Sequence, residues 1–148
     1  IPPKKFHPKA ERGMKDQVTS IEQSKRLIEL GVPAQKASMV WRTMSTKTGR
    51  RKLQIACEED IGWLCRNFPT QYAPAFTVAD LLGLLPKKIE DTRTRLHNLT
   101  IPHTSKKYSE IEYKGAYGVI WSCFGPSLLD NLVEAINWAI NSRQELNI

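Results

Sequence analysis

The sequence predicts an α+β fold, in which a small antiparallel sheet is packed by helices and a long amphipathic helix ends the chain. Three observations support this prediction. Residues 127–146 place apolar side chains at helical spacing, residues 108–124 predict two strands around a turn, and residues 19–31 predict a capped helix. Because helices stand near both ends and strands mostly between them, the pattern favours α+β over regularly alternating βαβ units.

The C-terminal helix has the clearest pattern. Ser127 is a favourable N-cap, and Asp130 follows three residues later in the first turn. The apolar stripe at helical spacing consists of Leu129, Leu132, Val133, Ile136, Ala139 and Ile140. Trp138 lies off this stripe, so we expect it to face a neighbouring element or a partner.

The middle of the chain predicts shorter elements. In the 108–124 hairpin, Ile111 and Tyr113 face one side, and the turn is expected near Lys114 and Gly115. The other predictions are a strand over 52–58, a helix over 58–68, irregular backbone over 69–74, a capped helix from Thr77 with Asp80 at N3, and a strand over 95–101.

Length and composition predict one globular domain, residues 18–148, behind a flexible basic arm, residues 1–17. The chain has 148 residues, 41% hydrophobic and 25% charged, which suits a folded domain. No apolar run approaches the roughly 18 to 20 residues of a membrane helix. Because no hydrophobic segment follows the basic N-terminus, we expect no signal peptide, a cytoplasmic protein and no membrane partner.

Residues 20–41, SIEQSKRLIELGVPAQKASMVW, predict two short helices around a turn. Thr19 begins a capping box with Glu22, and Gly31 is a natural C-cap. A second short helix is expected from Ala34, continuing or giving way to a strand near Val40 and Trp41.

This pair raises the hypothesis of a DNA-binding helix-turn-helix, which has a glycine followed by a hydrophobe in its turn, as Gly31 and Val32 provide. Leu27 and Ala37 depart from the pattern, because they stand where a small residue and a branched hydrophobe are usual. The favoured interpretation is two helices that share a core. In the DNA-binding alternative, the base-reading side chains are Gln35, Lys36 and Ser38.

The net charge of +7 is unevenly spread. Basic patches attract polyanions, and they are also common on solvated loops and tails. The stretch RTMSTKTGRRK, residues 42–52, contains no acidic residue, and the N-terminal arm is also basic. The most favoured function is therefore a non-enzymatic binding module that holds nucleic acid through phosphates. The predicted contact residues are Lys4, Lys5, Arg42, Lys47, Arg50, Arg51 and Lys52.

An alternative function is a protein–protein adaptor or inhibitor. It would use exposed apolar and tryptophan surface, and the positive charge would steer an acidic protein partner. The oligomeric state is left open by the sequence.

No cofactor or metal site is expected. The three cysteines, Cys57, Cys65 and Cys123, each stand among apolar residues and predict small, reduced, buried thiols. A zinc site that combines Cys57 and Cys65 with His97 and His103 matches no usual ligand spacing.

A metal-dependent nuclease is the third alternative. Glu112 and Lys114 have the Glu-x-Lys spacing that such enzymes use on a strand. A second metal-binding acid is also needed, and Asp91 and Glu110 are candidates that no pattern fixes. The chain has no P-loop and no GxSxG motif, so enzymatic function is not favoured.

Three motifs resemble a group of small proteins from phages and mobile elements of gut anaerobes. They are SIEQSKRLIELGVP followed by ASMVW, then PAFTVADLLGLLP, then LVEAINWAI, spread over residues 18–142. The group has no established activity. Because the motif residues are mostly apolar or capping, the resemblance implies a shared core, and the basic arm and loop are particular to this chain.

Overall fold

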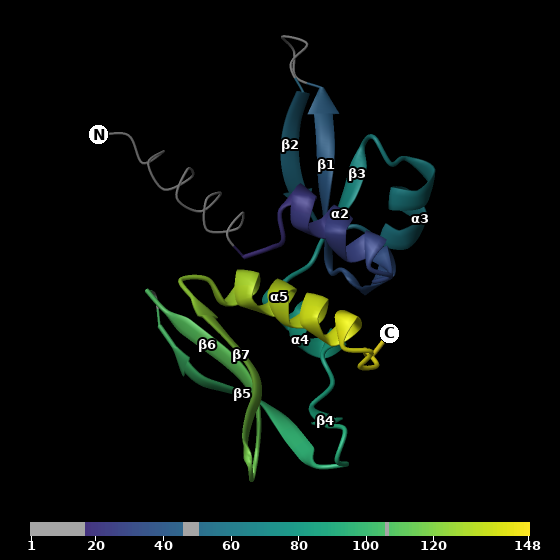
Figure 1. Ribbon diagram of the computed structural model, residues 1–148. Helices are drawn as coiled ribbons and strands as arrows, with labels where there is room; N and C mark the ends of the chain where they lie inside the picture. Colours follow the sequence, from purple (N-terminus) through teal and green to yellow (C-terminus); the bar gives the residue numbers. More distant parts are fainter. Residues whose placement is uncertain (1–16, 46–50, 106) are drawn as a thin grey trace, which may run out of the picture. The chain divides into compact units, whose positions relative to one another are not determined.

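A computed structural model describes residues 17–45, 51–105 and 107–148, without the side chains of residues 44, 45, 51–53 and 103. The chain divides into two compact units, residues 1–80 and 81–148. Figure 1 shows helices together with two antiparallel sheets, which confirms the predicted α+β class. This division does not test the prediction of one domain over residues 18–148, and residues 1–16 of the predicted arm lie outside the described residues.

The first helix of unit 1, α2 (Ile21–Glu29), begins one residue later than predicted. Its N-cap is Ser20, whose hydroxyl accepts from the backbone N–H of Gln23 at 3.1 Å, while the Gln23 side chain accepts from the Ser20 N–H at 2.9 Å. Thr19 is buried instead, and its hydroxyl accepts from the Phe76 N–H at 3.0 Å. The predicted box therefore has the right form but the wrong residues, because neighbouring Thr and Ser are both good caps.

The second predicted helix is reduced to one short turn, and it gives way to a strand, which is one of the two continuations that the sequence left open. Gly31 takes a φ of 104°, which ends α2, and only a single 3₁₀ turn, η2 (Ala34–Lys36), follows. The chain enters strand β1 (Met39–Ser45), because pairing with two neighbouring strands overrides the weak helical preference of this segment. A helix-turn-helix is therefore absent from residues 20–41, and the interpretation as two core helices holds only for the first of them.

Unit 1 contains a three-stranded antiparallel sheet in the order β2-β1-β3. Strand β2 (Arg51–Ala56) confirms the predicted strand. Strand β3 (Tyr72–Ala75) was not predicted, and the expectation of irregular backbone over 69–74 is wrong for its residues. Pro74 lies within β3 opposite Val40. A proline is tolerated there because β3 is at the edge of the sheet, where one side of the strand has no partner to receive an N–H.

Two helices flank β3 along the chain. The predicted helix over 58–68 is confirmed as α3 (Ile61–Asn67). The capped helix is confirmed as α4 (Val78–Leu84), where the Asp80 N–H donates to the Thr77 hydroxyl at 3.1 Å and the Asp80 carboxylate accepts from the Thr77 N–H at 2.9 Å. The core of unit 1 includes Trp41, whose indole N–H donates to the Thr19 carbonyl at 2.8 Å.

Unit 2 contains a four-stranded antiparallel sheet in the order β4-β5-β6-β7. The strands are β4 (Lys88–Glu90), β5 (Leu96–Thr104), β6 (Ser109–Gly115) and β7 (Gly118–Gly125). The hairpin is confirmed, although its turn falls between Gly115 and Gly118, slightly later than predicted. Ile111 and Tyr113 are buried, as the alternation predicted.

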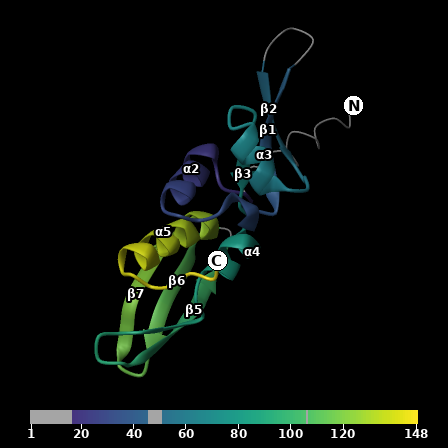
Figure 2. The same ribbon diagram turned by 90° about the vertical axis from the view of Figure 1, so that its right-hand side faces the viewer.

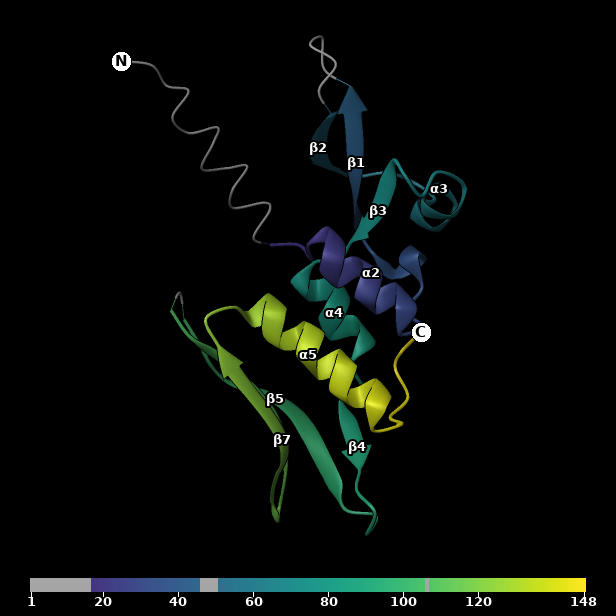
Figure 3. The same ribbon diagram turned by 45° about the horizontal axis from the view of Figure 1, so that its top comes forward.

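The C-terminal helix α5 (Leu128–Asn141) contacts β6 and β7 and lies across one face of this sheet (Figure 3). Ser127 caps it, accepting from the Asp130 N–H at 3.2 Å, as predicted. Trp138 faces a neighbouring element, since its ring stacks on Trp121 of β7 with centroids 5.3 Å apart. Among the described residues, no helix has both the length and the apolar character needed to cross a membrane.

Candidate functional site

The β1–β2 hairpin forms a two-stranded ribbon at one end of unit 1. Strand β3 pairs only with Met39–Arg42 of β1, and the Thr43 N–H donates to the Gln71 carbonyl at 2.9 Å. Beyond this point β1 pairs with β2 alone, and the ladder continues to Ser45 opposite Arg51. Figure 2 shows both strands extending past β3 and α3 of the same unit. We call this part, β1 and β2 beyond Thr43, the ribbon.

Two of the predicted nucleic-acid contacts, Arg51 and Lys52, lie at the end of the ribbon. The backbone of Arg51 and Lys52 lies on β2 opposite Ser45 and Met44, while their side chains are not described. Other predicted contacts, Lys4, Lys5, Lys47 and Arg50, lie outside the described residues. Between Arg42 and Cys57 the sequence has no acidic residue, so no carboxylate of the hairpin itself neutralises these cations.

Arg42 lies at the base of the hairpin and is already engaged. Its guanidinium forms an ion pair with Glu58 at 3.0 Å, and it donates to the Gln54 side chain at 3.2 and 3.4 Å. A phosphate would have to compete with both partners. Arg42 is the one predicted contact whose side chain the structure describes, and its role is local and structural.

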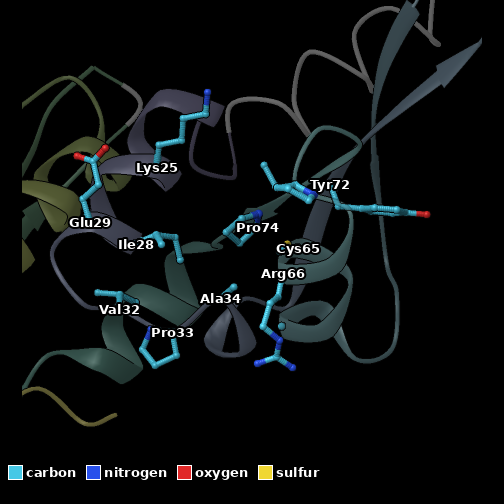
Figure 4. A pocket seen from close by; sticks show the side chains of 13 residues that line it. Lys25, Ile28, Glu29, Val32, Pro33, Ala34, Cys65, Arg66, Tyr72 and Pro74 are labelled. Carbon is cyan, nitrogen blue, oxygen red and sulfur yellow. The ribbon is translucent and has the colours of Figure 1, made fainter.

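An apolar hollow, which we call the groove, lies in unit 1 between α2, α3 and β3. Its volume is about 430 Å³, within the roughly 300–1,000 Å³ range of ligand sites. Figure 4 shows its lining, which consists of Lys25, Ile28, Glu29, Val32, Pro33, Ala34, Gly62, Cys65, Arg66, Pro69, Tyr72, Ala73 and Pro74. Only three of these residues are charged, and the Lys25 ammonium and the Arg66 guanidinium point away from the groove at different edges.

A second, more open hollow of about 720 Å³ adjoins the groove at the start of α3. It is lined by Gln35, Asp60, Gly62, Trp63 and Arg66, so the two hollows share Gly62 and Arg66. The Gln35 side chain accepts from the Gly62 N–H at 2.8 Å, which ties η2 to the first turn of α3. A Cβ at Gly62 would lie only 2.8 Å from this Gln35 oxygen, so a larger residue there would displace the end of the Gln35 side chain.

Three aromatic side chains continue the apolar surface from the groove. Phe68 contacts the Trp63 ring edge-on, with centroids 5.7 Å apart, and the Tyr72 ring at 6.4 Å. Trp63 is 50% exposed and Phe68 is 42% exposed. We call Trp63, Phe68 and Tyr72 the aromatic row. Exposed aromatic surface beside a preformed hollow is typical of binding sites.

The cysteines differ from the prediction of buried thiols. Cys57 is exposed, while Cys65 and Cys123 are half-buried, and all three are free thiols. Cys65 lines the groove, and burial raises the pKa of its thiol. A neutral thiol suits the apolar lining and is a poor nucleophile.

The acidic residues of the nuclease hypothesis each have local partners in unit 2. Glu112 accepts from the Thr100 hydroxyl at 3.3 Å, and Glu110 accepts from the Tyr108 hydroxyl at 3.3 Å. Asp91 is held in the turn between β4 and β5 by the Arg95 backbone N–H, at 3.0 Å. Nowhere in the described parts of the chain do three or more His, Cys, Asp or Glu side chains gather as metal ligands would.

The buried His97 pairs with the half-buried Asp91, which the sequence did not predict. The His97 Nε2 lies 3.2 Å from the Asp91 carboxylate, and its Nδ1 is buried without a hydrogen-bond partner. Hydrogen bonds from the Arg95 backbone, and then from His97, hold the pKa of Asp91 well below its usual range. Nδ1 lies beside Gly115, where an added Cβ would be 3.1 Å away, so a residue larger than glycine would crowd the His97 ring. The pair is structural.

Sequence reasoning missed the groove because its walls come from three separate segments. One signal was present: Pro69 and Tyr72, which line the groove, stand with Trp63 and Phe68 of the aromatic row within ten positions. Comparison with protein-family models, with curated proteins and with solved structures finds no match to this chain.

Proposed function

We propose that this chain is a non-enzymatic module that contacts nucleic acid through the basic end of the ribbon, together with the basic arm. The observation that supports it is the ladder from Val40–Ala56 to Ser45–Arg51, which brings Arg51 and Lys52 to the end of a two-stranded antiparallel ribbon. A two-stranded ribbon fits the major groove of duplex DNA, and several DNA-binding proteins use one. In line with the resemblance of its motifs, the module is proposed to belong to a phage or mobile element.

Contacts of this kind hold phosphates and do not read bases. Lysine and arginine side chains release counterions from the nucleic acid, so affinity falls steeply with salt. The conformation of residues 34–41 supports this restriction, because a single 3₁₀ turn followed by a strand provides no α-helix to enter a groove.

The test is fluorescence anisotropy with labelled duplex DNA, single-stranded DNA and RNA, each at low and at physiological salt. The Arg50→Ala/Arg51→Ala/Lys52→Ala variant should weaken binding, and the slope of affinity against salt should fall by about one for each phosphate that the variant no longer holds. The matched control removes three exposed cations of unit 2: Lys87→Ala/Lys88→Ala/Lys114→Ala. Equal weakening in both variants would mean that net charge alone is responsible, and binding confined to low salt would reject the proposal.

The second candidate function is a protein–protein adaptor, and the groove with its aromatic row favours it. Tryptophan and tyrosine are enriched among the residues that supply most binding energy in protein interfaces. In this function the positive charge of the chain serves to steer an acidic partner.

A further inference from the structure

The groove and the aromatic row limit what kind of protein segment can bind. We propose that they bind a proline-rich segment of a partner protein, with an acidic residue among its prolines. This inference rests on the adaptor function proposed above, and it adds the class of partner.

Strand addition at the groove is prevented by β3 itself. A strand that joins a sheet needs alternating N–H and C=O groups along the free edge. The Tyr72 N–H, on the edge facing away from β1, already donates to the Phe68 carbonyl at 3.0 Å. Two residues on, Pro74 has no N–H to offer. An occupant must therefore bind mainly through side chains and not by main-chain pairing.

The aromatic row suits a segment in the polyproline II conformation. Such segments dock against aromatic surfaces, and they lose little entropy because they are already extended. Their carbonyls have no internal hydrogen bonds, so they need donors from the receptor. Among the described residues, the Trp63 indole N–H and the Tyr72 hydroxyl have no hydrogen-bond partner, so both can donate. Figure 4 shows the Tyr72 hydroxyl directed away from the groove, along the surface beyond it.

The groove walls are rigid, which favours a rigid ligand. Pro33, Pro69 and Pro74 line it, and their rings fix the backbone locally. Ala34 and Ala73 add short side chains with no rotamers to order. Because little is ordered in the receptor and little in the ligand, even a small contact area can give measurable affinity.

The position of Arg66 sets the charge of the segment. Lys25 and Glu29 line only the groove and Asp60 only the second hollow, whereas Arg66 lines both. Its guanidinium points away from the groove, so a segment that continues from the groove into the second hollow meets it there. Its guanidinium has no ion-pair partner in the described parts of the chain. A planar guanidinium binds a carboxylate through two hydrogen bonds, so an acidic residue is expected at this point of the segment.

The test uses the intact chain and three labelled peptides of equal length, measured by fluorescence anisotropy. One has prolines around a central glutamate, the second has the same prolines around a central lysine, and the third forms an amphipathic helix. We expect saturable binding of the glutamate peptide, about two- to fivefold tighter than that of the lysine peptide. Arg66→Glu should reverse this preference. Trp63→Ala should weaken binding at least about tenfold, while Tyr117→Ala, an exposed aromatic of unit 2, should leave it unchanged.

Other outcomes separate this inference from the adaptor function. Tighter binding of the helical peptide, lost in Trp63→Ala, would overturn the proline-rich partner and leave the adaptor function standing. An order of affinities that Arg66→Glu does not change would overturn the acidic residue. Absence of saturable binding by all three peptides would reject both the inference and protein binding at this groove.

Discussion

Ser38 donates both its backbone N–H and its hydroxyl to the carboxylate of Asp80, 42 residues further along the chain. The N–H bond to Oδ2 is 2.8 Å long, and the same oxygen accepts from the Thr77 N–H at 2.9 Å. One carboxylate therefore caps α4 and also fixes the chain just before β1 begins.

Replacing this carboxylate should destabilise unit 1. Asp80→Ala leaves the N–H groups of Ser38 and Thr77 without an acceptor, so we expect a loss of about 1–3 kcal/mol in the free energy of unfolding. Urea denaturation measures it. Glu59→Ala, which removes an exposed carboxylate with no hydrogen bond in the described structure, is the control and should change stability by less than about 0.5 kcal/mol. Equal effects in the two variants would contradict the capping role.

Asp91 should make stability depend on acid pH. Its pKa is lower in the folded protein than the ordinary value of 3.8, so the unfolded chain binds a proton first as pH falls. The stabilisation is complete above about pH 5 and is lost progressively as pH falls through and below about 4. Asp91→Asn should flatten this part of the curve. Urea midpoints measured from neutral pH down to about pH 2 test it, and parallel curves for both proteins would exclude Asp91 as the cause.

Tyr113 should make stability depend on alkaline pH in the opposite sense. Burial raises its pKa to about 12, and its hydroxyl donates to the Pro86 carbonyl at 2.8 Å. Its stabilisation is therefore complete below the ordinary pKa of 10.0 and is lost as pH rises toward the folded value. Tyr113→Phe should cost about 1 kcal/mol at neutral pH and should remove this loss.

Denaturant midpoints between about pH 8 and 11 give both the cost of Tyr113→Phe and the loss of stability with rising pH. Tyr117→Phe, in which the tyrosine is 78% exposed, is the control and should follow the parent curve. A Tyr113→Phe variant that loses stability with pH as steeply as the parent would disprove the assignment.

Two glycines offer a test of close packing in unit 2. A Cβ at Gly115 would lie 2.4 Å from the Leu96 carbonyl oxygen and 3.1 Å from His97 Nδ1, and a Cβ at Gly83 would meet nothing within 4 Å. Gly115→Ala should therefore destabilise by about 1–3 kcal/mol. Gly83→Ala, near the end of α4, should be neutral or stabilising by up to about 1 kcal/mol, because alanine favours a helix. The melting temperatures of both variants test this prediction. A larger loss in Gly83→Ala than in Gly115→Ala would show that the β5 backbone moves to accommodate the added Cβ.

The sequence predicted those elements whose signals are local. Ser127 with Asp130 and Thr77 with Asp80 were recognised as caps, because a helix start depends on residues only three positions apart. The first helix was also predicted, but its N-cap was assigned to Thr19 instead of the neighbouring Ser20, so its start was misplaced by one residue. For residues 34–41 the sequence left open whether the short second helix runs on or gives way to a strand, because this depends on pairing with distant strands.

The short strands and the groove depend on contacts that no local pattern encodes. Strand β4 has only three residues, with Ile89 buried between two exposed residues, and an alternation this short cannot be recognised in the sequence. Pro74 argued against a strand, and only the edge position of β3 makes it acceptable. Ile28 and Cys65 line one groove from different helices, which requires knowledge of the packing.

The stacked rings of Trp121 and Trp138 have an optical consequence. Two indoles 5.3 Å apart and nearly parallel couple their electronic transitions, so unit 2 should give a paired circular dichroism signal that disappears when α5 leaves β7. Both rings belong to unit 2, so an unmodified sample should report the melting of that unit through this signal. Its coincidence with the loss of the total backbone signal would measure how cooperatively the chain folds.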